Sequence, residues 1–289
     1  MAARKPKKVA KLATGRPPGA RKSRPTLSAQ TTRTTIRAFH QLNKSLQTAQ
    51  AAGNHAEAAE FQKRIDDLGG LKIYQQASIQ GQANERGGDS SVVLMQWLES
   101  GKNNLTASEA KRSMLEVGAL STKNACSKSN LFDITRIDLN SQSEGILEQD
   151  FMQRPLPSAD SERFDIISLS LVVNFVPDAE GRGEMLRRSC NFLRASTMPN
   201  THDGAETVFP ALFLVLPAPC ILNSRYFNSE RLTLLMASLG YVLLQRKQTA
   251  KLVYYLWQLR DKPLSTEPYF PKVKLHDGGG RNNFCIVLR

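Results

Sequence analysis

The sequence predicts an α/β protein, in which an open and mainly parallel sheet follows a helical extension. Three observations favour this class. From Lys111 onward, apolar runs of strand length alternate with polar or helical segments, which is typical of parallel strands buried on both faces. Before that point, apolar residues recur at three- and four-residue spacing, as on one face of a helix. A length of 289 residues with 40% hydrophobic content is sufficient for one large or two modest domains.

The N-terminal segment carries nearly all of the net charge of +13. Residues 1–56 contain twelve Lys and Arg and no Asp or Glu, whereas the other 27 basic and 26 acidic residues leave the rest of the chain at +1. The opening stretch has four prolines and no aromatic residue, so we expect residues 1–30 to form a disordered basic tail. This tail is either a nuclear or nucleolar address that also binds phosphates, or a solvated segment without a specific role.

Residues 31–110 are predicted to be helical. Two amphipathic stretches within Thr31–Leu68, separated by AAGNH, indicate a helical hairpin. A short helix is expected over VVLMQWLES, with Ser90 or Ser91 as its N-cap.

The predicted sheet domain spans residues 111–289. Its strands are expected at Ser113–Leu120, Asp133–Leu139, Phe164–Val172 and Ala211–Pro217, with a short one near Ile146–Phe151, and its helices at Arg182–Arg194 and Ser229–Leu239. The C-terminal part adds three strand-like runs, YVLLQRKQT, KLVYYLWQL and NNFCIVLR. One of the last two runs, KLVYYLWQL or NNFCIVLR, is expected to be inserted into the sheet, and the sequence does not decide between them.

Composition and spacing exclude several classes of protein. The chain has no long uncharged apolar run and no apolar segment behind its basic start, so we expect an intracellular protein without a membrane span or secretory signal. The four cysteines are far apart, and the four histidines form no metal-binding pattern. Neither a structural metal nor a disulfide framework is expected.

A glycine and two aspartates stand at the ends of successive predicted strands. Gly118 ends the first, Asp138 follows twenty positions later at the end of the second, and Asp150 follows the third. In an open parallel sheet, such a glycine lets the backbone approach a ligand, and such an acid binds a ribose diol. Asp150 would accept from an exocyclic adenine amine, with Phe151 against the ring. The alternatives are that Gly118 is an ordinary turn residue and that each Asp is a helix cap.

The glycine pattern discriminates between adenosine ligands. A dinucleotide site requires G-x-G-x-x-G because the pyrophosphate needs close backbone and a helix N-terminus, whereas this chain has GALSTKN with one glycine. S-adenosyl-L-methionine carries no phosphate and needs a glycine turn, a ribose acid and an adenine pocket. The sequence therefore favours S-adenosyl-L-methionine over NAD.

Several stretches resemble one protein family. They are RGGDSS, MLEVGALSTKN, RIDLNS, EQDFMQRPLP, FDIISLSLVVNFVPDAEGRGEMLRR and NNFCIVL. Together they are similar to the fungal nucleolar 25S ribosomal RNA adenine-N1 methyltransferases, whose animal relatives include an S-adenosylmethionine sensor. The likeness runs from about Tyr74 to the C-terminus. It implies a Rossmann-like class I S-adenosylmethionine-dependent methyltransferase sheet and a nuclear, nucleolar location.

The resemblance also implies roles for individual residues. Gly118 would lie against the methionine part of the cofactor, Asp138 would hold the ribose, and Asp150 with Phe151 would hold the adenine. Ser168 to Ser170, at the end of the fourth strand, would face the methyl group, with Ser168 assigned to the cofactor.

The base would be positioned by the residues that follow the same strand. In SLSLVVNFVP, Asn174 would orient the edge of the target adenine and Phe175 would stack on it. The alternative is that Asn174 is a turn residue and Phe175 a core residue. N1 of adenine has its own lone pair, so bringing it into line with the methyl group supplies most of the catalysis and no base is required.

The resulting prediction is an enzyme that methylates N1 of an adenine in large-subunit ribosomal RNA. A non-catalytic S-adenosylmethionine sensor that regulates a protein partner is the rival, and a structural ribosome-assembly factor is a third reading. The acid-free basic tail favours the RNA enzyme, because a sensor has no need to bind phosphates.

Overall fold

The computed structural model describes residues 29–70, 88–100, 111–141, 143–195, 208–260 and 269–289. The predicted basic tail lies outside these residues up to position 28. The predicted helical hairpin is present: α1 (Ala29–Ala51) and α2 (His55–Asp67) pack on each other. The side chain of Asn54 accepts from the N–H of Glu57 and caps α2.

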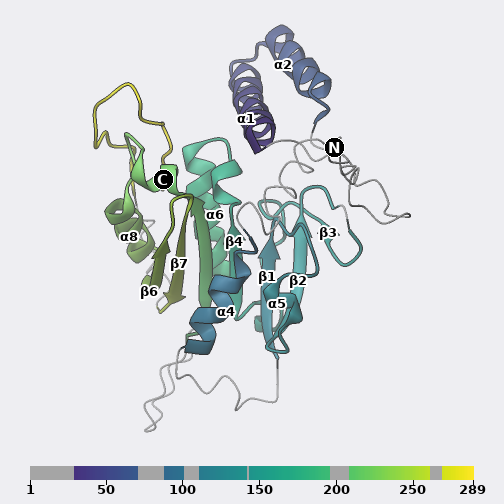
Figure 1. The fold of residues 1–289 in the computed structure, drawn as a ribbon, viewed down its shortest axis with the longest axis vertical. Helices are drawn as coiled ribbons and strands as arrows, with labels where there is room; N and C mark the ends of the chain where they lie inside the picture. Colours follow the sequence, from purple (N-terminus) through teal and green to yellow (C-terminus); the bar gives the residue numbers. More distant parts are fainter. Residues whose placement is uncertain (1–28, 71–87, 101–110, 142, 196–207, 261–268) are drawn as a thin grey trace, which may run out of the picture.

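A seven-stranded sheet forms the body of the molecule, with strand order β3-β2-β1-β4-β5-β7-β6 (Figure 1). Its strands are β1 (Arg112–Val117), β2 (Phe132–Asp138), β3 (Leu147–Glu148), β4 (Ile166–Ser170), β5 (Ala211–Pro217), β6 (Tyr241–Gln248) and β7 (Leu252–Leu259). The first five pair in parallel, and β7 pairs antiparallel with both β5 and β6. The inserted strand is therefore residues 252–259, and the predicted Rossmann-like methyltransferase sheet is confirmed.

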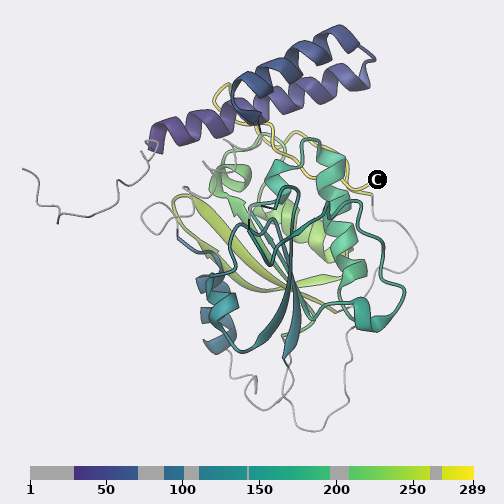
Figure 2. The ribbon, with the colours of Figure 1, turned by 90° about the vertical axis from the view of Figure 1, so that its right-hand side faces the viewer.

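Helices cover both faces of the sheet (Figure 2). Side chains of β1, β4, β5 and β7 alternate between two cores, one against each face. On one face lie α4 (Ser91–Ser100) and the short α5 (Ala125–Lys128); on the other lie α6 (Ala179–Phe192), α7 (Ala218–Leu222) and α8 (Ser229–Ser238). Short 3-10 helices occupy Asp160–Glu162 and Val173–Phe175. Burial on both faces explains the continuous apolar runs of the sequence.

The last residues of the chain form no strand of the sheet, although NNFCIVLR reads as one. Residues 284–288 are buried in the core on the α6 and α8 face. A Cβ built on Gly183 of α6 would lie 1.8 Å from the carbonyl oxygen of Val287. A glycine at this position is therefore what allows the C-terminal segment to pass against the helix.

Three predicted boundaries differ from the structure for local reasons. The fourth strand ends at Ser170, because Leu171 takes a positive φ of 59° that interrupts the extended backbone. Helix α6 begins at Ala179, since the Asp178 side chain accepts from Gly181 N at 2.6 Å and caps it. Neither predicted serine caps α4; an Asp89 carboxylate oxygen accepts from the first N–H of the helix at 2.9 Å.

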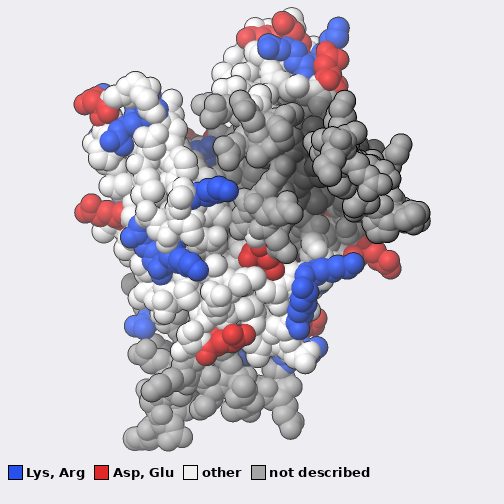
Figure 3. Space-filling view, viewed as in Figure 1, with Lys and Arg blue, Asp and Glu red and all other residues white. Residues whose placement is uncertain are grey.

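No helix among the described residues is long and apolar enough to span a bilayer. On the face seen in Figure 1, basic and acidic side chains of the described residues are interspersed (Figure 3). This agrees with the near-neutral charge of the chain beyond residue 56.

Candidate active site

Parallel strands end side by side at the edge of the sheet where ligands bind in open α/β folds. Gly118 follows β1, and its N–H donates to the carbonyl of Ile137 at 2.8 Å, which joins the turn to the end of β2. Asp138 is the last residue of β2, and its carbonyl accepts from Gln149 N at 2.9 Å, one residue before Asp150. The structure therefore brings the predicted positions Gly118, Asp138 and Asp150 together at one edge.

Gly118 is required by the backbone and by its surroundings. Its φ is +73°, a left-handed conformation that favours glycine. A Cβ at this position would lie 2.7 Å from Cγ2 of Val172, in the loop after β4. The ends of β1 and β4 thus approach each other closely, with no side chain of residue 118 between them.

The two aspartates order the loops that they begin. One carboxylate oxygen of Asp138 accepts from Asn140 N at 2.9 Å, and one of Asp150 accepts from Met152 N at 2.8 Å. Both contacts are Asx turns rather than the helix caps considered as the alternative. Because each turn fixes its own loop, the carboxylates are held at the mouth of the sheet, where both residues are partly buried.

Phe151 lies in the core instead of facing a ligand. Only 2% of its surface is exposed, and its ring centroid lies 5.3 Å from that of Phe192, with Arg188 5.9 Å from its ring. The predicted stacking of this ring on adenine does not agree with such burial. Phe151 instead anchors the loop of Asp150 to α6.

Of the predicted serines Ser168 to Ser170, Ser168 is buried. It is 5% exposed and lies two residues inside β4, opposite Glu116 of β1. The serine at the end of the strand is Ser170, whose hydroxyl lies 2.8 Å from the hydroxyl of Ser90. The side chain that reaches the edge of the sheet is therefore Ser170.

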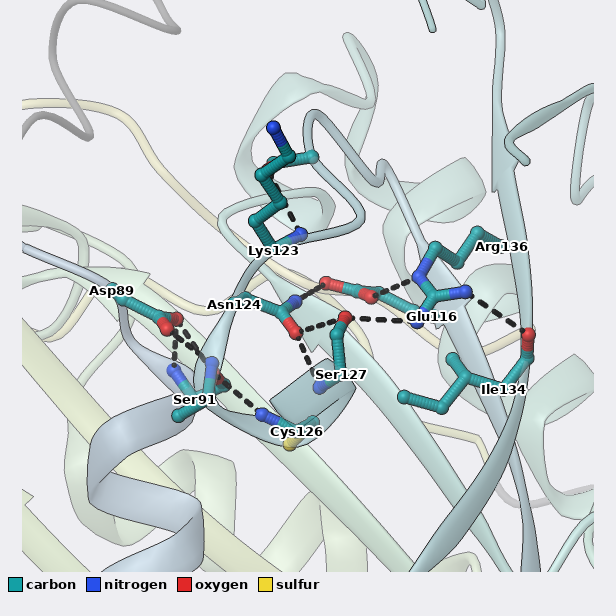
Figure 4. A network of polar contacts seen from close by, with 11 residues as sticks. Asp89, Ser91, Glu116, Lys123, Asn124, Cys126, Ser127, Ile134 and Arg136 are labelled. Atoms are coloured by element: carbon teal, nitrogen blue, oxygen red, sulfur yellow. Dashed lines mark hydrogen bonds and ion pairs between the residues drawn. The ribbon is translucent and has the colours of Figure 1, made fainter. Parts of the chain in front are cut away.

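A buried carboxylate next to the glycine turn was not foreseen. Glu116 Oε1 accepts from Asn124 Nδ2 at 2.7 Å, while Oε2 is buried without a hydrogen-bond partner and lies 3.7 Å from Arg136 Nε (Figure 4). Burial raises the pKa of the Glu116 carboxyl to about 7, although the Asn124 hydrogen bond and Arg136 act to lower it. A perturbed carboxyl two residues before the predicted cofactor glycine is a candidate functional group.

Asp89 fixes the glycine turn from its other side (Figure 4). One of its carboxylate oxygens accepts from both the N–H and the hydroxyl of Ser91, at 2.9 and 2.6 Å. The other accepts from Ala125 N, the first residue of α5, at 2.6 Å. Helices α4 and α5 therefore share one carboxylate, which holds the chain between Gly118 and α5 in place.

The predicted base-binding residues lie in the loop directly after β4. Asn174 and Phe175 belong to the 3-10 turn Val173–Phe175, and both are partly buried. Oδ1 of Asn174 is buried and has no hydrogen-bond partner among the described residues. Since an unpaired buried acceptor costs about 1–3 kcal/mol, this oxygen is a candidate to accept a hydrogen bond from a bound ligand.

Arg182 holds this loop to the C-terminal segment. Its guanidinium donates to the carbonyls of Val176 at 2.8 Å, Pro177 at 3.1 Å and Cys285 at 2.8 Å, and lies 4.8 Å from the ring of Phe284. Burial lowers the pKa of Arg182 from its usual value. One side chain thus connects the loop of Asn174 to the end of the chain.

A charge inside an apolar strand, as in MLEVG, was the sequence signal for Glu116. No such signal marked Arg182, whose partner Cys285 is far away in the chain. The described residues contain no group of three or more His, Cys, Asp and Glu side chains that could hold a metal ion.

Comparison with known proteins identifies related sequences. A family model described as 25S rRNA (adenine(2142)-N(1))-methyltransferase, Bmt2, matches residues 59–286. The 25S rRNA (adenine(2142)-N(1))-methyltransferase of Saccharomyces cerevisiae is 39% identical over 247 residues, which is 85% of this chain and 68% of the relative. The 25S rRNA adenine-N(1) methyltransferase of Schizosaccharomyces pombe is 35% identical over 254 residues, covering 87% and 89%.

A solved structure, the N-methyltransferase NodS from Bradyrhizobium japonicum WM9 in complex with S-adenosyl-L-homocysteine, aligns over 59% of this chain and 87% of its own. Its sequence identity is 15% and the TM-score is 0.37. The fold assignment accordingly depends on the strand order and not on this alignment.

Proposed function

The chain belongs to the family of 25S rRNA (adenine-N1)-methyltransferases, and on that premise we propose how its site methylates N1 of an adenine in large-subunit ribosomal RNA. The adenine that corresponds to position 2142, named for the Saccharomyces cerevisiae relative, is the target we propose. The cofactor is S-adenosylmethionine, the substrate is ribosomal RNA, and the residue assignments below follow from the geometry of the site.

The residues at the edge of the sheet fit S-adenosylmethionine. Carboxylates close to one glycine turn would repel a pyrophosphate, whereas a cofactor with hydroxyls, amines and no phosphate suits them. We assign Asp138 to the ribose diol, Asp150 to the exocyclic amine of the cofactor adenine, and Gly118 to the methionine part. Oε2 of Glu116, buried without a hydrogen-bond partner, would accept from the cofactor ammonium. When bound, the cofactor supplies a methyl group made electrophilic by its sulfonium.

The observation that carries the base assignment is the buried, unpartnered Oδ1 of Asn174. The exocyclic amine of adenine is a hydrogen-bond donor and would satisfy this oxygen. Guanine has an acceptor oxygen at the same place, so its entry would leave two acceptors facing each other. Asn174 would therefore select adenine and turn its N1 edge toward the methyl group, with Phe175 against the face of the base.

Transfer needs little further chemistry from the chain. N1 of adenine attacks with its own lone pair, so no side chain has to remove a proton beforehand. The contribution of the site is orientation, which is worth several kcal/mol when reacting atoms are held in line. A sensor that merely bound the cofactor would have no use for a buried acceptor in the loop after β4, which favours the enzyme.

Methyl transfer can be tested directly. The purified protein is incubated with labelled S-adenosylmethionine and large-subunit ribosomal RNA from cells that lack it, and the digested RNA is examined for labelled 1-methyladenosine. Because N1 methylation blocks the Watson–Crick edge, the same site should stop reverse transcription and give the position. Binding of the cofactor without transfer to naked RNA or to partly assembled large subunits would favour the sensor.

We also propose that the protein works in the nucleus, in the nucleolus. The proposal is supported by its RNA substrate and by the acid-free basic segment of residues 1–56. Removing residues 1–28 takes away nine positive charges and leaves α1 and α2 intact. Fluorescence microscopy of the tagged variant should show weaker nucleolar accumulation; unchanged accumulation would contradict the proposal.

A further inference from the structure

Residues 269–283 form a loop of fixed shape at the end of the sheet to which the parallel strands point (yellow in Figure 1). Arg225, after α7, organises it. The Arg225 carbonyl accepts from the N–H groups of Leu275 and His276 at 2.7 and 3.1 Å, and its side chain donates to Gly278 O at 3.1 Å and to Asn283 Oδ1 at 2.7 Å. These hydrogen bonds order the loop, although it contains no helix or strand.

The loop and the segment beneath it, residues 223–231, are basic. Together they contain five Lys and Arg and two acids, so the patch carries a net charge of +3 at pH 7. Lys272 is exposed, with Nζ 4.1 Å from the ring centroid of Tyr226, a contact that positions the ammonium without neutralising it. Lys274 pairs with one of the acids, Asp277. Blue side chains, with a red one at the outer edge, are visible on this lobe at the upper left of Figure 3.

Two further features suit a nucleic acid. Among the described residues, a Cβ at any of Gly278, Gly279 and Gly280 would meet no heavy atom within 4 Å, so no described side chain covers the backbone there and a phosphate can approach it. Tyr269 at the start of the loop is 70% exposed. An exposed aromatic ring on the same loop as lysine and arginine residues is the combination that binds single strands, since bases stack on the ring while the cations contact phosphates.

The segment that follows the loop is connected to the proposed catalytic site. Phe284, the first residue after the loop, accepts a hydrogen bond through its carbonyl from the hydroxyl of Ser224 at 2.5 Å. The next residue, Cys285, shares the guanidinium of Arg182 with Val176, two residues after Asn174. These contacts connect residues 284–285, where the loop ends, to the loop of Asn174.

We propose that residues 269–281 with Arg225 are the docking surface for the ribosomal RNA strand that flanks the target adenine. This inference rests on the proposed function of the site, and assigns to it the surface that contacts the sugar-phosphate backbone. Lys272 and Arg281 contact phosphates, and Tyr269 stacks on an unpaired base. An acidic protein would use the charges but would gain nothing from the bare glycine backbone.

The test compares two double variants that remove the same charge. Lys272→Ala/Arg281→Ala alters the loop, while Lys111→Ala/Lys128→Ala removes two exposed lysines at the opposite, amino-terminal edge of the sheet. Binding of an RNA fragment with the target adenine is measured as a function of salt. For two lost phosphate contacts, the slope of log K against log salt should flatten by about 1.4–1.8, and affinity at 0.1 M salt should fall by about 25- to 60-fold.

The control variant should bind as the wild type does, and Tyr269→Ala should weaken binding without changing the slope. Methyl transfer at saturating RNA and affinity for S-adenosylmethionine should stay unchanged in all variants. If the loop variant keeps the wild-type affinity and slope, the surface is refuted while the enzyme assignment stands. If it loses RNA affinity but the wild type transfers no methyl group, the surface is supported and the proposed function fails.

Discussion

Replacement of Gly118 by alanine should destabilise the protein through two separable effects. The positive φ of +73° costs a non-glycine residue about 1–2 kcal/mol. The new Cβ would lie 2.7 Å from Val172 Cγ2, and such overpacking costs about 1–3 kcal/mol more. The free energy of unfolding, measured by urea denaturation, should therefore fall by about 2–5 kcal/mol. Calorimetry should show weaker binding of S-adenosylmethionine, since the loop after β4 must move.

The structure provides a control for each effect. Gly88 has a nearly identical φ of +72°, and no heavy atom of the described residues lies within 4 Å of a built Cβ, so Gly88→Ala should cost the backbone term alone, about 1–2 kcal/mol. Val172→Ala removes Cγ2 and leaves Cβ, 3.9 Å away in ordinary contact. In that background, Gly118→Ala should cost no more than Gly88→Ala. A cost that is the same with and without Val172 would refute the steric argument.

Three further changes test the site. Burial raises the pKa of Glu116 to about 7, so the carboxylate forms as pH rises. The affinity for S-adenosylmethionine should therefore increase about tenfold from pH 5.5 to 7. Glu116→Gln should abolish this pH dependence, and a dependence that persists in the variant would assign it to another group. Asn174→Ala should reduce methyl transfer at unchanged cofactor affinity, whereas Asn174→Asp, which keeps the acceptor, should retain more activity than Asn174→Ala; equal losses would contradict the hydrogen-bond role. Arg182→Met should lower the rate constant of single-turnover transfer with little effect on cofactor affinity. Arg187→Met alters an arginine of the same helix whose hydrogen-bond partners are Glu184 and the carbonyl of Arg289, and it should change neither quantity. Identical rates in the two variants would show that Arg182 does not position the loop.

The arrangement of Gly118, Asp138 and Asp150 was predictable because it depends on local sequence and one general rule. Each residue follows an apolar run, and the carboxyl ends of parallel strands meet at one edge. The identity of the inserted strand was not predictable, since both candidate runs, KLVYYLWQL and NNFCIVLR, are apolar and have the length of a strand. Which of them pairs with β5 depends on contacts between segments far apart in the chain.

Errors in the site came from partners that no local pattern shows. Phe151 follows a strand as a stacking residue would, yet Phe192 and Arg188 of α6 enclose its ring. The fourth strand was predicted to run to Val172 because nothing in SLSLVV reveals the positive φ of Leu171, which ends it at Ser170. The pKa of Glu116 depends on burial, and the amino-acid sequence does not show how deeply this side chain is buried in the fold.

The insertion of β7 between β5 and β6 has a consequence for folding and aggregation. Strand β5 is the central apolar strand ALFLVLP, and β7 pairs with it along its full length. Because β6 contacts the sheet through β7, the two strands join the sheet as one hairpin. Until then β5 is an open edge, apolar on both faces and without the charges that normally prevent strand addition between molecules. A partly folded chain that lacks the hairpin therefore exposes an aggregation-prone edge at β5. Variants that destabilise residues 241–259 should form aggregates before they lose cofactor binding.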